Sequence, residues 1–277
     1  MNSKASIGRL GQLSLVCILL AACGTPPDPV SVMRRDADRY VSRARRESSE
    51  GNWQEAQQAW RDAGLRFAAL DDRQGVGESR LGVALVMHRQ GRFVEAKQQL
   101  EQMLADAAGY PETIQFEVHL QLALLDVRGG LYTAAAERFG QAEALCNAGC
   151  SRRAALYNGK ARLVIQQSHF DDAKRLATIA LQAAGSDKAE SANAQRLLGQ
   201  IAIQQQDWAG AHTLLEAALT ADKQIGDPSR ISKDLALLHK LAHSRGDQAA
   251  ATSLLARLTA LCQSLATPPA DCGATDN

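Results

Sequence analysis

Two histidines four residues apart, His239 and His243 in the stretch HKLAH, have the spacing closest to that of a metal site. On a helix, residues four apart share a face, and two imidazoles placed in this way can bind zinc. The catalytic form of the motif needs a glutamate directly after the first histidine, and this chain has Lys240 there. We therefore interpret the pair as structural or solvent-facing and predict no metal site.

No other motif indicates catalysis or a bound cofactor. The glycines of GVGES, at 75–79, lack the GxGxxG spacing and follow no predicted strand. The sequence contains neither a GxxxxGK phosphate loop nor a GxSxG nucleophile elbow. Its acidic pairs, such as Asp71–Asp72 and Asp171–Asp172, lie where carboxylates cap helices. We expect no catalytic residue, no cofactor and no small-molecule substrate, and therefore a protein that is not an enzyme.

The composition favours helices. Hydrophobic residues make up 45% of the 277 residues but aromatic residues only 4%, and Ala, Leu and Gln dominate. Sheets favour β-branched and aromatic residues, so this profile predicts an all-α protein packed through small side chains. With 31 basic and 30 acidic residues, the charge balance gives no reason to expect nucleic acid as a partner.

A six-residue pattern recurs along the chain every 38 to 40 residues. Its copies are GNWQEA, GRFVEA, GLYTAA, SHFDDA, QDWAGA and GDQAAA, which end at Ala56, Ala96, Ala135, Ala173, Ala211 and Ala251. Each copy lies between two helix-length segments. The glycine permits a sharp turn, the alanine permits close approach of the two helices, and the aromatic fills the space beside it. Neither helix can bury its apolar stripe alone, so successive units must stack.

This pattern resembles the tetratricopeptide repeat. The signature also includes a small residue early in each first helix, matched by Ala44, Ala84, Ala123, Ala161 and Gly199. The resemblance implies an α-solenoid, a right-handed superhelix of about six helix–turn–helix repeats over residues 37–265. We place the repeats near 37–70, 77–110, 116–149, 154–187, 192–225 and 232–265.

Four positions depart from this signature. His239 stands where a small residue is usual, Ser168 and Gln206 replace the turn glycine, and Gln248 replaces the aromatic. Two of these departures fall in the sixth repeat, which is therefore expected to be the weakest. A weak last repeat is consistent with a polar terminal cap.

The first 22 residues have the features of an export signal. Lys4 and Arg9 give a positive start, and LGQLSLVCILLAA supplies an apolar core too short for a membrane span. LAAC, which ends at Cys23, resembles the lipobox of bacterial lipoproteins. This resemblance implies a signal peptide over 1–22 and a lipidated Cys23, with ordinary secretory cleavage as the alternative. Residues 23–36 are then the lipidated cysteine and a linker.

The residue after Cys23 bears on the location. Gly24 is not the aspartate associated with retention at the inner membrane. The resemblance therefore implies a lipid anchor at the periplasmic face of the outer membrane.

Four cysteines remain once Cys17 leaves with the signal and Cys23 is lipidated, namely Cys146, Cys150, Cys262 and Cys272. An even number in an exported chain suggests two disulfides, for which three pairings are possible. The local pairings are favoured, because the first closes the short turn CNAGC and the second would pin the C-terminal tail, 266–277, to the last helix. A zinc site is the alternative, although the spacing fits no compact CxxC pair.

The resemblance also implies a binding surface. In tetratricopeptide arrays the first helices line a concave groove at their second, fifth, ninth and twelfth positions. The corresponding candidates are Leu81, Leu85, Leu120, Leu124, Asn158, Arg162, Asn193, Arg196, Gln200 and Lys240, with His88, Val127, Ile165, Ile203 and His243 at further positions. An apolar stretch beside a basic, amide-rich stretch suits a protein segment that carries a carboxylate. Mobile surface side chains are the alternative.

Together these features predict a non-enzymatic, outer-membrane-anchored scaffold or adaptor that binds proteins of the cell envelope. The resemblance implies a role in envelope, pilus or secretion-system assembly, and the residues do not choose among these. The alternative is a structural subunit of an envelope complex that binds through its convex face or by self-association.

Overall fold

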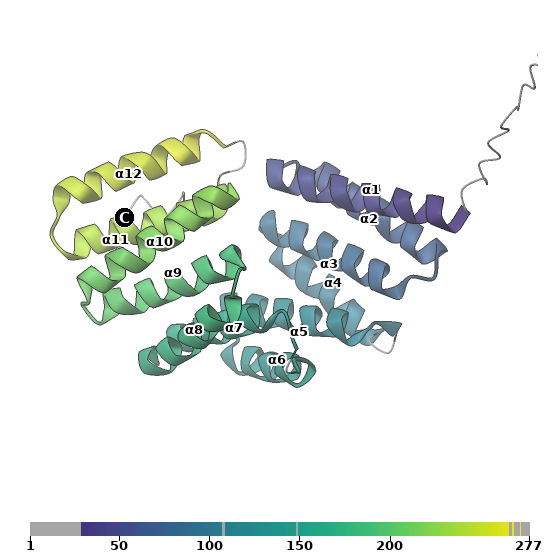
Figure 1. The fold of residues 1–277 in the computed structure, drawn as a ribbon, viewed down its shortest axis with the longest axis horizontal. Helices are drawn as coiled ribbons and strands as arrows, with labels where there is room; N and C mark the ends of the chain where they lie inside the picture. Colours follow the sequence, from purple (N-terminus) through teal and green to yellow (C-terminus); the bar gives the residue numbers. More distant parts are fainter. Residues whose placement is uncertain (1–28, 107–108, 148, 266–267, 269–271, 273–277) are drawn as a thin grey trace, which may run out of the picture.

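The structure is a computed structural model that describes residues 29–106, 109–147, 149–265, 268 and 272. Over these residues the chain forms twelve α-helices and no strand. Consecutive helices pair into hairpins, and the hairpins stack in sequence order into a curved array (Figure 1). The fold is therefore the all-α repeat solenoid that the sequence predicts.

The helices of the first three hairpins are α1 (Pro29–Glu50) and α2 (Trp53–Ala69), α3 (Arg73–Arg89) and α4 (Phe93–Ala105), and α5 (Glu112–Arg128) and α6 (Tyr132–Leu145). Those of the last three are α7 (Arg153–Gln166) and α8 (Phe170–Ala184), α9 (Lys188–Gln204) and α10 (Trp208–Ile225), and α11 (Pro228–Ser244) and α12 (Gln248–Gln263).

The ends of the chain bear on the expected domain boundaries. The signal segment 1–22 and Cys23 lie outside the described residues. Helix α1 begins at Pro29, so the second half of the expected linker, 23–36, belongs to the first helix. Of the expected tail, 266–277, only residues 268 and 272 are described. No helix in the described part is both long and apolar enough to span a bilayer.

Each hairpin closes through the same backbone turn. Six residues there have φ between 58° and 80°, namely Gly51, Gly91, Gly130, Ser168, Gln206 and Gly246. In every case the next residue donates its N–H to a carbonyl five residues earlier, as in Arg92 to Met87 at 2.9 Å and Asp207 to Ala202 at 2.9 Å. This is the Schellman arrangement, which satisfies carbonyls at the end of the first helix. Ser168 and Gln206 thus adopt a backbone that favours glycine.

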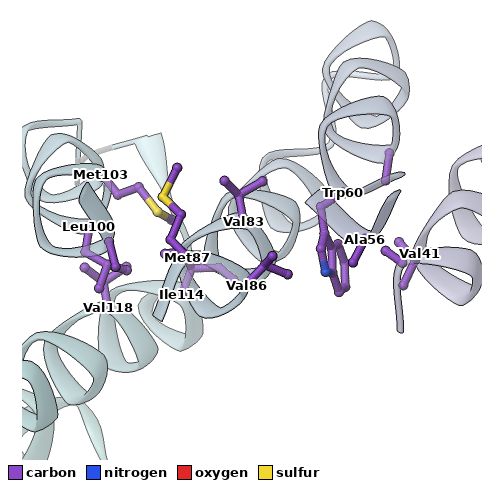
Figure 2. Packing of buried hydrophobic residues seen from close by; sticks show 14 of the residues in the cluster. Val41, Ala56, Trp60, Val83, Val86, Met87, Leu100, Met103, Ile114 and Val118 are labelled. Carbon is purple, nitrogen blue, oxygen red and sulfur yellow. The ribbon is translucent and has the colours of Figure 1, made fainter. Parts of the chain in front are cut away.

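The core is a seam of small and large side chains between helices. The six pattern alanines are buried, with exposed fractions of 2% or less. Gly82 lies so close to Trp60 that a Cβ there would be 2.3 Å from the ring. Figure 2 shows Val41, Trp60, Met87 and Leu100 following one another across the first hairpins, where one cluster of buried side chains extends from α1 to α5. Because the helices touch through small residues, large ones pack into the space beside these contacts.

Two disulfides lie in the second half of the chain. One joins Cys146 to Cys150, with Cα atoms 5.1 Å apart, in the connection between α6 and α7. The other joins Cys262 near the end of α12 to Cys272, with Cα atoms 5.7 Å apart. These are the two local pairings favoured by the sequence.

Glycine at position 168 or 206 is expected to stabilise the array. Left-handed backbone costs a residue with a Cβ about 1 kcal/mol. Ser168→Gly and Gln206→Gly should therefore each raise the free energy of unfolding by about 0.5–1 kcal/mol in urea titrations followed by circular dichroism.

Gly91→Ala is the matched control, because Gly91 has φ +77° and a Cβ built there meets no heavy atom within 4 Å. It isolates the cost of the backbone and should lower the free energy of unfolding by a similar amount. A lower urea midpoint for Ser168→Gly would contradict the prediction.

Candidate functional site

The first helices of the hairpins form the inner layer of the curve. Neighbouring first helices contact one another from α3 through α5, α7 and α9 to α11, whereas the second helices make no comparable contacts among themselves. In a curved stack, the layer whose members touch is the inner one. The concave surface is therefore made by α3, α5, α7, α9 and α11.

Several residues expected to line this surface are buried within it. Leu120 is 1% exposed, Asn158 4% and Arg196 7%. Leu81 and Leu124 are half-buried and pack against the core clusters, and Leu85 is 49% exposed. Of the apolar candidates, Leu85 therefore offers the most surface to a partner, whereas Leu120 is part of the buried packing of the inner layer.

The amides of the middle repeats bind the chain itself. Asn158 on α7 donates to the backbone oxygen of Glu190 at 3.0 Å and to its Oε2 at 2.9 Å. Asn193 donates to the same carboxylate at 3.2 Å and accepts from Arg196 at 2.8 Å. The bonds of Asn158 fasten α7 to α9, and those of Asn193 orient Glu190 and Arg196 within α9.

Arg196 is the centre of a buried ionic network. Its Nε donates to Oδ1 of Asp234 at 2.6 Å, and its Nη2 pairs with Asp222. Arg230 adds a contact to Asp222 at 3.4 Å, and the side chains of Asp222 and Asp234 are fully buried. Burial raises the pKa of Asp234 to about 6, against the opposing effect of Arg196. The network joins α9, α10 and α11, so Arg196 is not available to a partner.

Arg162 has the opposite character. Its side chain is exposed, and it forms no hydrogen bond or ion pair with another of the described residues. Desolvation by the surrounding protein lowers the pKa of its guanidinium, and the charges of Arg196 and Arg230 lower it too, against the opposing effect of Glu190. An arginine remains charged under these conditions. Lys240 on α11 is exposed as well, and Gln200 on α9 is half-buried.

Further cations gather around His88 on α3. Burial lowers the pKa of His88, and the charges of Arg89, Arg128, Lys233 and Arg162 add to this effect and bring it to about 4. We call these four residues the inner cation cluster. They come from α3, α5, α11 and α7, so the curvature brings charges from four repeats to one region. His88 is therefore neutral at neutral pH.

Aromatic contacts hold part of the cluster in place. The Arg128 guanidinium lies 4.0 Å from the centre of the Phe93 ring, and His88 meets the same ring edge-on at 5.3 Å. Stacking of this kind orients a guanidinium without neutralising it. Arg128 is exposed and, within the described residues, takes part in no ion pair.

The candidates predicted from the sequence do not include three members of the cluster, namely Arg89, Arg128 and Lys233. Arg89 and Arg128 are the last residues of α3 and α5, just beyond the positions carried over from the family. Basic residues at the same place in two successive first helices were a usable signal. No sequence signal indicated Lys233, because its proximity to α3 depends on the curvature of the whole array.

The histidine pair shows no sign of a metal centre. The rings of His239 and His243 lie 6.5 Å apart. In the described part of the chain, no three His, Cys, Asp or Glu side chains are grouped in a way that could hold a metal ion.

Known structures share this architecture. BtubC (BKLC) from P. vanneervenii is 21% identical with a TM-score of 0.54, over 86% of this chain and 92% of that one. Pseudomonas aeruginosa pilF is 16% identical with a TM-score of 0.53, over 82% and 93%. The Cut9–Hcn1 hetero-tetramer of APC/C gives 15% identity and a TM-score of 0.56, over 83% of this chain and 45% of the other. No protein-family model and no curated protein sequence matches the chain.

The chain has a tetratricopeptide-type fold. In this tetratricopeptide array the concave surface offers fixed positive charges beside the exposed Leu85. Such a surface can bind carboxylates through charge-assisted hydrogen bonds and an aliphatic side chain through contact with leucine.

Removal of the Arg196 charge is expected to destabilise the tetratricopeptide array far more than removal of the Arg162 charge. Arg196→Met removes the ion-pair partner of buried Asp234 and leaves Asp222 with Arg230, and breaking a buried pair in this way costs about 3 kcal/mol. Arg162→Met removes an exposed charge and should change the free energy of unfolding by less than about 0.5 kcal/mol.

Chemical unfolding of both variants at pH 7.5 measures the difference. Equal stabilities would contradict the assignment of Arg196 to the interior. The same contrast makes Arg162 a suitable position for testing binding and Arg196 an unsuitable one.

Proposed function

We propose that this chain is a lipid-anchored scaffold of the bacterial cell envelope whose concave surface binds an acidic segment of a partner protein. The partner belongs to an envelope, pilus or secretion assembly at the periplasmic face of the outer membrane. The array does no chemistry itself. It holds the partner through a preformed surface, with the lipid fixing where the complex forms.

The observation that carries this proposal is the contrast between the buried acids of the array and the exposed cations of its inner layer. The buried acids Asp126, Asp222 and Asp234 all have cationic partners within the chain. Arg128 and Arg162 are exposed on the inner layer and form no ion pair within the described residues, although the charge of Glu190 acts on Arg162. Exposed cations on a concave surface favour a ligand that brings its own carboxylates.

The neighbouring apolar surface narrows the class of ligand. Leu85 is 49% exposed on α3, the same helix that carries Arg89, and Leu124 is half-buried on α5, the helix that carries Arg128. A segment that places an aliphatic side chain near its acidic residues fits both features. A purely polyacidic ligand would leave the leucine exposed to water.

Support for the envelope location comes from the sequence. The lipobox-like LAAC places a lipidated Cys23 six positions before Pro29, so at most about 22 Å of chain separates the lipid from α1. The two disulfides fit an oxidising compartment such as the periplasm. The likeness to pilF concerns the fold and adds no partner to this argument.

Lipidation can be tested directly at Cys23. In the bacterial host, the wild-type protein should incorporate an alkyne-labelled fatty acid and fractionate with outer membranes. Cys23→Ala should lose the label and the outer-membrane association. Labelling that persists in Cys23→Ala, or a wild-type protein recovered in the soluble periplasm, would contradict the lipid anchor.

Partner binding can be tested with charge reversals on the concave surface. The double variant Arg128→Glu/Arg162→Glu should bind fluorescently labelled hexaglutamate at least about tenfold more weakly than wild type in anisotropy titrations at 0.15 M salt, because attraction becomes repulsion. Arg257→Glu, an exposed reversal on the second helix α12, is the matched control and should bind like wild type.

The same variants separate the two modes of interaction in cells. A photocrosslinking residue at Leu85 should capture a partner in wild type and lose it in the double variant. Crosslinks formed only from exposed second-helix positions such as Thr252 would favour binding through the convex face or self-association.

A further inference from the structure

One ion pair joins parts of the chain that are distant in sequence. Nη2 of Arg89, the last residue of α3, lies 3.4 Å from Oδ2 of Asp227, the residue before α11. The two residues are 138 positions apart. Figure 1 shows the reason, because the array curves until the C-terminal end of α3 faces the N-terminal end of α11. The pair therefore spans the curve between the second and the sixth hairpin.

Arg89, one member of the pair, belongs to the inner cation cluster. Arg89 acts on His88 together with Arg128, Arg162 and Lys233, so Asp227 brings a carboxylate of the chain to the edge of a region with several positive charges. Neither partner is deeply buried, with exposed side-chain fractions of 36% for Arg89 and 24% for Asp227. Water and a competing carboxylate can therefore reach the contact.

Asp227 has other interactions to keep if Arg89 leaves. Its Oδ1 accepts from the backbone N–H of Ser229 at 2.9 Å and of Arg230 at 3.3 Å, which caps α11. Its Oδ2 lies 3.7 Å from Nε of Arg230. Release of Arg89 thus leaves no buried or unpaired acid behind, so its free-energy cost is small.

We infer that Asp227 pairs with Arg89 as long as no partner is bound. A carboxylate of an acidic partner segment then displaces Asp227 from Arg89 and opens the array between α3 and α11. This inference rests on the proposed binding of an acidic segment. It adds that binding and opening are coupled, because Arg89 cannot form a full ion pair with Asp227 and with a partner carboxylate at the same time.

The experiment removes the charge of Asp227 and keeps its cap. Asp227→Asn is suitable because asparagine caps a helix as well as aspartate does. Arg89→Gln removes the other half of the pair. Spin labels on Val94→Cys and Lys223→Cys, in a soluble Cys23→Ser background, report the distance between α4 and α10 by pulsed electron paramagnetic resonance.

Either single substitution should lengthen and broaden the distance distribution, with a fall of up to about fivefold in the ratio of closed to open molecules. The double variant should resemble the singles, because each already removes the whole interaction. Salt at 1 M should open the wild type and leave Asp227→Asn unchanged. Unchanged distances in both single variants would overturn the closing contact.

Hexaglutamate binding tests the competition. Asp227→Asn should bind the peptide several-fold more tightly than wild type, because the internal competitor is gone, whereas Arg89→Gln should bind it more weakly. Open distances with unchanged or weaker peptide binding by Asp227→Asn would overturn the displacement. If the peptide binds no variant at all, the acidic partner of the proposed function is rejected, and the distances alone decide whether the pair closes the array.

Discussion

Close contact between helices through alanine and glycine is the constraint on which the structure depends. A hairpin of this chain has an apolar stripe on each helix and no room for a core of its own. The stripe is buried only when the next hairpin lies against it, and the small residues set how near it can come. The pattern alanines are buried in all six hairpins, so the two helices of each hairpin approach closely there. Together with the contacts among first helices, this packing produces the curve.

The curve in turn creates the candidate site. No single repeat contains a binding motif, and the inner cation cluster draws one residue each from α3, α5, α7 and α11. Positive charges at this density would repel one another on a flat surface exposed to water. Here the hairpins that carry them are held together by buried alanines and leucines whose combined burial is worth far more than such repulsion. The hydrophobic seam therefore supports an arrangement of charge that is unfavourable by itself.

The sequence predicted the repeats well and the binding residues less well, for physical reasons. Repeat number, turn positions and local disulfides depend on residues within about 40 positions of one another, and such patterns are visible in one chain. The depth of a side chain in the inner layer depends on its neighbours in the next hairpin. Arg196 stands on the predicted face, yet Asp222 and Asp234 come from α10 and α11 to neutralise it. Lys233 reaches the cluster only because the whole array bends, which no repeat signature contains.

The contact between Arg89 and Asp227 also limits how such a chain can evolve. Stacked hairpins with identical turns are readily duplicated or lost, since each unit needs only a similar neighbour. A bond that crosses the arc makes the count matter. One hairpin more or fewer between α3 and α11 would move Asp227 away from Arg89. The ion pair therefore ties the number of repeats to the pitch of the superhelix.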